Sequence, residues 1–204
     1  KVARAEFDKQ VAGMNDIVSD LQNQISVLKG QLNIAINKNN SLGQSLASQI
    51  NTNSELENIN TNLSRKVSLA SLLIPTSINV AGVRIKSSGK EDETDNSKKL
   101  EKIRICWTIP ENPVAEAGEK TFYVRIINPE QITLNAGTAG SGVINNARDG
   151  SPIQYSMPVT ANYENKAVNT CSYWSQPTPY NKGVYTVNIY QDGYLLGGQK
   201  LELK

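Results

Sequence analysis

An unbroken heptad pattern in the first third of the chain constrains its fold more than any other feature. Positions spaced alternately three and four residues apart, from Val11 to Ala70, number eighteen, and fourteen of them hold apolar residues. No proline precedes Pro75, so no residue of this stretch breaks a helix by lacking an amide hydrogen. A repeat that keeps its phase for about eight heptads is typical of a coiled coil. The sequence therefore predicts a coiled-coil stalk over residues 1–70, about 100 Å long at 1.5 Å per residue.

Three polar residues in the apolar seam indicate how such helices associate. Asn39, Asn53 and Asn60 fall at a positions, where a buried asparagine lowers stability but fixes the register by pairing with its own counterpart. These asparagines favour a parallel dimer. Isoleucines at the flanking e and g positions widen the apolar stripe and favour a trimer; they are Ile17, Ile36, Ile50 and Ile59. We expect the chain to associate with itself, and both oligomer numbers stay open.

A helical hairpin is the alternative for the same residues. Residues 37–41 are rich in turn-forming side chains, and Gly43 would then open a second arm. A hairpin gives no reason for the heptad phase to continue across its turn, as the phase does from Ala35 to Leu42. The straight helix is therefore preferred.

A second segment begins after Pro75, where the helical period ends. Seven short runs alternate between apolar and polar residues, and each is bounded by Gly, Pro, Asn or Asp. Their spacing predicts a β-sandwich over residues 78–204, joined to the stalk by a linker at residues 71–77. The runs are Ile78–Lys86, Leu100–Ile109, Lys120–Ile127, Ile153–Tyr163, Ala167–Trp174, Val184–Tyr190 and Tyr194–Leu203. The fold class is α+β in two segments, a coiled-coil helix followed by an all-β sandwich.

The composition removes most kinds of catalytic site. The chain has no histidine, the commonest general base and metal ligand, and its two cysteines are too few for a Cys-rich zinc site. The net charge of +2 is spread evenly along the chain, so no basic patch for nucleic acid appears. No run of about 18 apolar residues is present to cross a membrane. We therefore expect a protein that is not an enzyme, holds no cofactor or metal and binds no nucleic acid.

The two cysteines leave the redox state open. Cys106 and Cys171 form a disulfide if the protein works in an oxidising compartment, and they stay free thiols if it is cytosolic.

Aromatic residues gather in the stretch with the least regular alternation. Tyr173, Trp174 and Tyr180 are candidates for a recognition surface, because exposed aromatic side chains supply a large contact area to a protein or glycan at low entropic cost. The alternative is that these side chains pack between the two sheets.

Two loops carry weaker signals. Residues 90–96 gather four carboxylates, which makes a Ca²⁺ site conceivable, but flanking lysines favour a solvated hairpin tip. The glycine-rich residues 136–142 lack the lysine of a phosphate-binding loop and predict a mobile loop.

The end of the chain resembles a known type of module. Residues 179–190 have the sequence Pro-Tyr-Asn-Lys-Gly-Val-Tyr-Thr-Val-Asn-Ile-Tyr, and Asp192–Gly193 then supply the positive φ angles of a type I′ hairpin turn. This resembles the final hairpin of immunoglobulin-like or fibronectin-like bacterial modules. A coiled coil followed by such a module also resembles uncharacterised bacterial envelope proteins, some of them described as chromosome-segregation-like from the coil alone.

The resemblance implies an immunoglobulin-like sandwich with a scaffolding or protein-recognition role in the periplasm or at the cell surface. It carries over no catalytic or binding residue, because such modules share a fold and not a site. Because Lys1 already begins a helical pattern, we expect any membrane attachment to be an N-terminal anchor absent from this chain. The alternatives are a carbohydrate-binding adhesin head and a cytosolic coiled-coil scaffold related to chromosome segregation.

Overall fold

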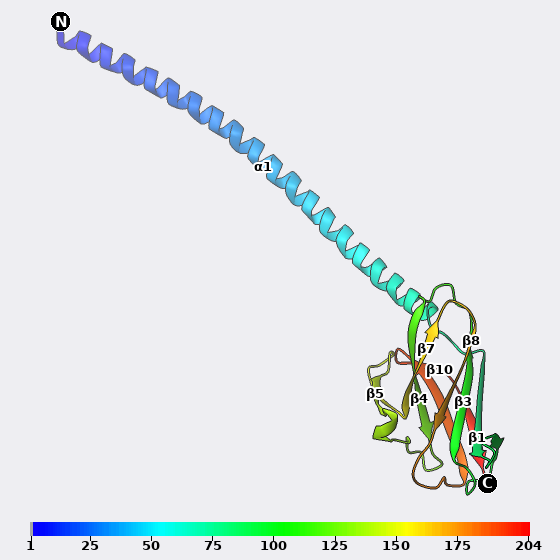
Figure 1. Cartoon of the computed structure of the whole chain (residues 1–204). Helices are drawn as coiled ribbons and strands as arrows, with labels where there is room; N and C mark the ends of the chain where they lie inside the picture. Colours follow the sequence, from blue (N-terminus) through cyan, green and yellow to red (C-terminus); the bar gives the residue numbers. More distant parts are fainter. Residues whose placement is uncertain (1) are drawn as a thin grey trace. The chain divides into compact units, whose positions relative to one another are not determined.

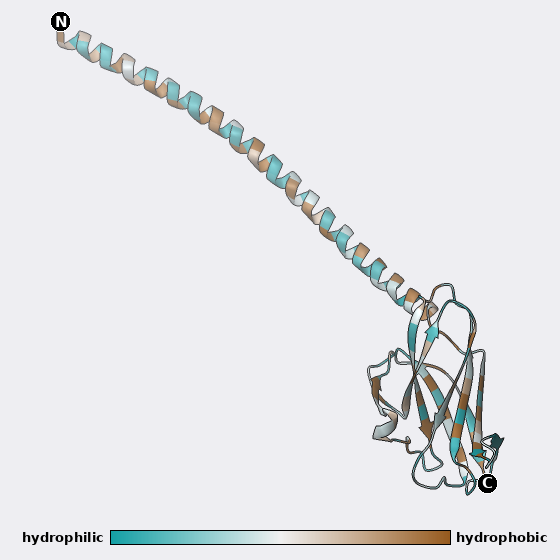
Figure 2. Cartoon of the chain, viewed as in Figure 1, coloured by the Kyte–Doolittle hydropathy of each residue, from teal (hydrophilic) through white to brown (hydrophobic). Residues whose placement is uncertain are grey.

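One uninterrupted helix forms the first part of the molecule. The computed structural model describes residues 2–204, and its helix α1 runs from Val2 to Ala70 (Figure 1). The helix continues through residues 37–41, so the helical hairpin is excluded. Every residue of α1 is exposed in the single chain, and apolar residues recur along its whole length (Figure 2). Burial within this chain therefore does not account for the apolar seam.

The second part is a sandwich of two antiparallel sheets. Its elements are β1 (Ser77–Ile85), β2 (Glu91–Glu93), β3 (Lys102–Ile109), β4 (Gly118–Ile127), the 3₁₀ turn η1 (Gly137–Ala139), β5 (Gly142–Asn145), β6 (Pro152–Tyr155), β7 (Met157–Tyr163), β8 (Val168–Trp174), β9 (Gly183–Gln191) and β10 (Tyr194–Leu203). One sheet has the order β2-β1-β3-β8 and the other β10-β9-β4-β7, with β5 and β6 as a separate hairpin. The sandwich has the immunoglobulin-like arrangement, in which β1, β3 and β8 on one sheet face β4, β9 and β10 on the other. The predicted fold class is confirmed.

The core lies between the two sheets, and β3 shows the alternation of buried and outward-facing residues most clearly. In β3 every second residue is buried, from Ile103 to Ile109. The Trp107 ring meets the Phe122 ring of β4 edge to face, with centroids 5.7 Å apart. Such pairs contribute about 0.5–1.5 kcal/mol beyond the area they bury. The seven predicted strands are all present in outline.

The predicted strand Ile153–Tyr163 is divided in two at Ser156. This serine is fully buried, its hydroxyl accepts a hydrogen bond from the Ile126 amide, and its own amide donates to the Val124 carbonyl. A side-chain oxygen thus replaces a backbone acceptor in the ladder. The residues before Ser156 pair with β5 and those after it pair with β4.

Residues 71–77 differ from the expected linker. Leu73 is fully buried in the core, and its amide donates a 3.0 Å hydrogen bond to the buried Gln191 side chain. The Asn112 amide group donates to the carbonyl oxygens of Ala70 and Leu72. This segment is therefore a packed part of the unit formed by residues 64–204, which also includes the last turns of α1.

Tyr185 near the start of β9 closes a local loop through its hydroxyl group. The hydroxyl accepts from the Asn181 amide at 3.0 Å and donates to the Asn181 carbonyl at 3.2 Å. This is the tyrosine corner of immunoglobulin-like sandwiches. Burial raises the pKa of the Tyr185 hydroxyl above its usual value.

We expect Tyr185→Phe to destabilise the sandwich by about 1–2 kcal/mol, because the ring stays while two hydrogen bonds are lost. Urea denaturation measures the change. Tyr123→Phe is the matched control, since the Tyr123 hydroxyl makes no hydrogen bond within residues 2–204. Equal stability of the two variants would contradict a stabilising role of the corner.

Candidate functional site

The predicted aromatic recognition surface does not form. Trp174 and Tyr180 are only 1% and 5% exposed, and the Tyr180 hydroxyl donates to the Trp174 carbonyl. Tyr173, at 43% exposure, is the one member of the three on the surface. Successive residues of β8 face opposite sides of the sheet, so Trp174 points into the core when Tyr173 points outward. The prediction is wrong for Trp174 and Tyr180, which are core residues.

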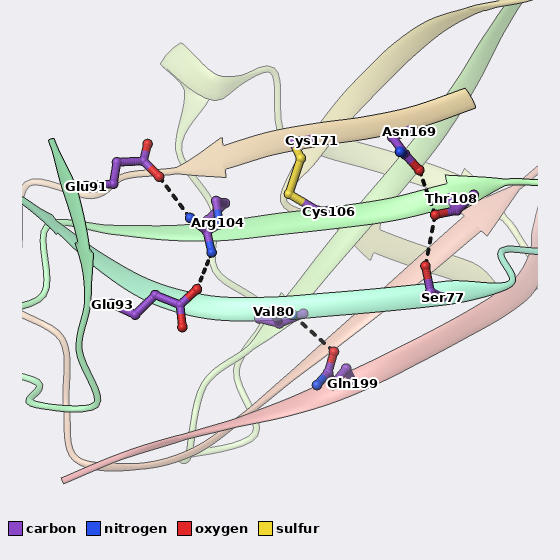
Figure 3. The surroundings of a disulfide bond; sticks show 10 residues. All are labelled: Ser77, Val80, Glu91, Glu93, Arg104, Cys106, Thr108, Asn169, Cys171 and Gln199. Atoms are coloured by element: carbon purple, nitrogen blue, oxygen red, sulfur yellow. Dashed lines mark hydrogen bonds and ion pairs between the residues drawn. A yellow bond between two sulfur atoms is a disulfide. The ribbon is translucent and has the colours of Figure 1, made fainter. Parts of the chain in front are cut away.

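The two cysteines meet on the outer face of the first sheet. Cys106 of β3 and Cys171 of β8 are direct partners across the strand ladder, with Cα atoms 4.0 Å apart, and a disulfide joins them (Figure 3). Cys171 is exposed and Cys106 half-buried. The bond links neighbouring strands of one sheet, whereas the disulfide of antibody domains joins the two sheets.

A polar ladder lies beside the disulfide on the same face. The hydroxyl groups of Ser77 and Thr108 are hydrogen-bonded at 2.9 Å, and Thr108 donates to the Asn169 side chain at 2.7 Å (Figure 3). These bonds join β1, β3 and β8 in a row. They are cross-strand pairs of the kind that stabilise a sheet, and all three side chains take part in them.

The carboxylates of residues 90–96 are engaged by cations. Glu91 and Glu93 flank the Arg104 guanidinium (Figure 3), and Asp92 pairs with Arg84 and Lys86. The hydrogen bonds from Arg84 and Lys86 hold the pKa of Asp92 below its usual value. The expected solvated hairpin tip is instead strand β2, which pairs with β1. Within residues 2–204, no group of three or more acidic or cysteine side chains is arranged to hold a metal ion.

The outer face of the second sheet carries the hairpin β5–β6. The rings of Tyr123 on β4 and Tyr155 on β6 lie with centroids 4.8 Å apart. The glycine-rich residues before β5 form the turn η1, which the Ser141 hydroxyl closes by donating to the Ala136 carbonyl, in place of the expected mobile loop.

The tip of the hairpin and the β9–β10 turn are in direct contact. The Ala147 amide donates to the Gly193 carbonyl at 3.2 Å. A Cβ atom on Gly193 would lie 2.2 Å from the Asn145 carbonyl oxygen, and φ here is 79°, so both space and backbone conformation require glycine.

An open cavity of about 460 Å³ lies beside this contact. Two arginines, Arg125 and Arg148, are among its lining residues. They are 23 positions apart in the sequence and belong to no motif, so sequence reasoning missed them.

The three asparagines of the helix seam stay at their expected places. Asn39, Asn53 and Asn60 lie on α1 and are exposed in the single chain, as are the leucines that alternate with them. Their predicted role in fixing register stays a prediction. In the described residues, no helix is both long and apolar enough to span a bilayer.

Comparison with known proteins identifies one similarity. The model of a family described as "Domain of unknown function (DUF8428)" matches residues 76–204, more than half of the chain. No curated protein and no solved structure matches the chain.

Proposed function

The chain belongs to the DUF8428 family of domains of unknown function, and from this premise we propose that it is a non-enzymatic, oligomeric stalk-and-head protein of the bacterial cell envelope. In this proposal α1 associates with α1 of a second or third copy. The sandwiches are then displayed together for scaffolding or protein recognition.

The exposed seam of α1 is the observation that carries the proposal. Leu21, Leu32 and Leu46 expose between 50% and 59% of their surface in the single chain. Large apolar side chains repeated over so many turns are stable in water only when another helix covers them.

The chemistry of the seam favours a second copy of this chain as the partner. Asn39, Asn53 and Asn60 all occupy a positions, where each asparagine pairs with its own counterpart in a parallel dimer. Residues 1–70 carry 7 basic and 6 acidic groups, so self-association meets no net repulsion.

The disulfide supports an envelope location. Disulfides persist in the periplasm and at cell surfaces, whereas the cytosol keeps thiols reduced. The Cys106–Cys171 bond lies partly exposed on a sheet surface, where cytosolic reductants would reach it. This argues against a cytosolic scaffold.

The mechanism of such a protein is multivalent display. Linking two or three heads makes the second binding event intramolecular, so weak contacts to a repetitive partner add up to strong attachment. Neither catalysis nor a cofactor is needed for this role.

Sedimentation equilibrium of the full chain at tens of micromolar tests the proposal, and we expect a dimer or trimer. Asn53→Leu should raise the stability of the helical part by roughly 1.5–3 kcal/mol per chain, the usual gain from burying a leucine side chain. It should also loosen the oligomer number, because the register-fixing pair is lost.

Asn51→Leu is the matched control, since it makes the same replacement at an f position outside the seam. This control should raise stability by only the roughly 0.5 kcal/mol or less by which leucine exceeds asparagine in helix propensity, and it should leave the oligomer number unchanged. A monomer that keeps its helical circular dichroism would overturn the proposal.

A further inference from the structure

The cavity beside the β9–β10 turn has the features of a binding site. Its walls come from the outer face of β4, the turn between β5 and β6, the start of β6, and the hairpin of β9 and β10. The lining residues are Arg125, Asn146, Arg148, Ser151, Pro152, Ile153, Tyr190, Gly193, Tyr194 and Leu195. Its volume of about 460 Å³ is within the range of about 300–1,000 Å³ that is typical of small-molecule sites.

The Arg125 guanidinium is hydrogen-bonded through its Nε atom, and its two terminal nitrogens are free to bind a ligand. Its Nε donates a 3.0 Å hydrogen bond to the Thr133 hydroxyl, and the side chain is half-buried on the outer face of β4. Neither terminal nitrogen has a hydrogen-bond partner within residues 2–204. A guanidinium fixed in this way loses little side-chain entropy when it binds an anion.

Arg148 projects from a tight turn that is itself well ordered. The Asn146 side chain accepts from the Arg148 amide at 3.0 Å, and the Asn146 and Gly150 amides close the turn with 2.8 Å bonds. The contact between Ala147 and Gly193 fixes the turn against the second sheet. The backbone of Arg148 is therefore fixed beside the cavity, while its exposed side chain stays free to reach a ligand.

The two charged residues that line the cavity, Arg125 and Arg148, are both cations. Neither Arg125 nor Arg148 is in an ion pair in the described part of the chain, whereas Arg84 and Arg104 both are. The nearby Asp149 carboxylate stays ionised, because hydrogen bonds from the hydroxyl and amide of Ser151 lower its pKa, and these bonds hold it in its own turn instead of in an ion pair with either arginine. Asp192, in the β9–β10 turn, lines a different cavity.

We propose that this cavity binds a sugar that carries an oxyanion, either a carboxylate or a phosphate. Guanidinium groups match the geometry of both oxyanions and pair with them through two parallel hydrogen bonds. Tyr190, Tyr194 and Leu195 supply the apolar walls on which a sugar ring can pack. The site lies entirely within the sandwich, so this inference does not depend on the proposed oligomer.

Isothermal titration of the full chain with four probes tests the proposal. Glucuronate and glucose 6-phosphate present the two oxyanions on the same ring, glucose lacks the charge, and inorganic phosphate lacks the ring. We expect at least one charged sugar to bind about ten-fold or more tightly than both glucose and inorganic phosphate, and its binding to weaken as salt is added. Whichever charged sugar binds better identifies the oxyanion.

Arg148→Gln should weaken that binding about ten-fold without affecting folding, because the side chain is exposed and makes no hydrogen bond within residues 2–204. Arg125→Gln should weaken it at least as much. Arg65→Gln on α1 removes the same charge at a residue that does not line the cavity, and it should leave binding unchanged.

Three results would overturn the proposal. The first is that neither charged sugar binds more tightly than glucose. The second is that inorganic phosphate binds as tightly as the charged sugars, which would make the cavity an oxyanion site without a sugar. The third is that Arg65→Gln weakens binding as much as Arg148→Gln, which would mean that only the overall charge matters.

Discussion

Reduction of the Cys106–Cys171 disulfide should lower the free energy of unfolding of the sandwich by about 4 kcal/mol. The bond closes a loop with a sequence separation of 65 residues, and a cross-link of that span removes about this much conformational entropy from the unfolded chain. Urea denaturation with and without dithiothreitol measures the effect. The chain's two tryptophans, Trp107 and Trp174, both lie in the core of the sandwich, so their fluorescence reports on this part alone.

The double variant Cys106→Ser, Cys171→Ser is the control for this prediction. Its denaturation midpoint should equal that of the reduced protein and should not respond to reductant. The native fold should persist in both, because β3 and β8 remain paired over seven residue positions. An unchanged midpoint on reduction would show that the disulfide contributes nothing to stability.

Leu73→Ala should destabilise the sandwich by about 2–5 kcal/mol, the usual cost of truncating a fully buried leucine. Leu73 is 0% exposed although it precedes the first strand by only a few residues. The neighbouring Ile74 is 56% exposed, so Ile74→Ala is a matched control that should change stability by less than about 0.5 kcal/mol. Similar losses in the two variants would contradict the packing of residues 71–77.

The same packing predicts where the sandwich begins as a folding unit. A fragment of residues 64–204 keeps Leu73 and the bonds from Asn112, and it should unfold cooperatively as a monomer. A fragment of residues 76–204, the span of the family match, loses Leu73 and leaves the buried Gln191 oxygen without its donor. It should be less stable by at least the Leu73→Ala amount.

Most of the architecture follows from periodicity alone. The heptad pattern predicts α1, and the period of two predicts the long strands because one face of each is buried. Asp192 and Gly193 have φ angles of 49° and 79°, as the expected hairpin turn requires. The short strands β2 and β5 are missed because three or four residues carry too little pattern to detect.

Two predictions are wrong for the same reason: the unbroken strand Ile153–Tyr163 and the linker at residues 71–77 both depend on tertiary contacts that the local sequence does not show. The apolar alternation runs through Ser156 without a break, and only its bond to the Ile126 amide shows that the strand divides there. Leu73 lies outside any periodic run, so nothing in the sequence distinguishes it from the exposed Ile74.

The candidate sites were harder to predict than the fold. A cluster of aromatic residues in the sequence does not show on which face of a strand each ring lies. The pairing of Cys106 with Cys171 places Tyr173 on the outer face with them and Trp174 opposite, among the core residues. Arg125 and Arg148 come together only because the hairpin β5–β6 folds back over the second sheet, and no local pattern predicts that contact.

The two ends of the sandwich's chain determine how the domain carries mechanical load. Asn112 donates to the carbonyl of Ala70, which precedes β1, whereas Lys204 is bonded to Asp95 and Ser97, which follow the contact between Thr94 and Gly82 in the second half of β1. A force applied between Ala70 and Lys204 therefore pulls β1 along its own axis. The hydrogen bonds to β3 run across that axis, so all seven residue pairs of the ladder are sheared together instead of being unzipped one by one.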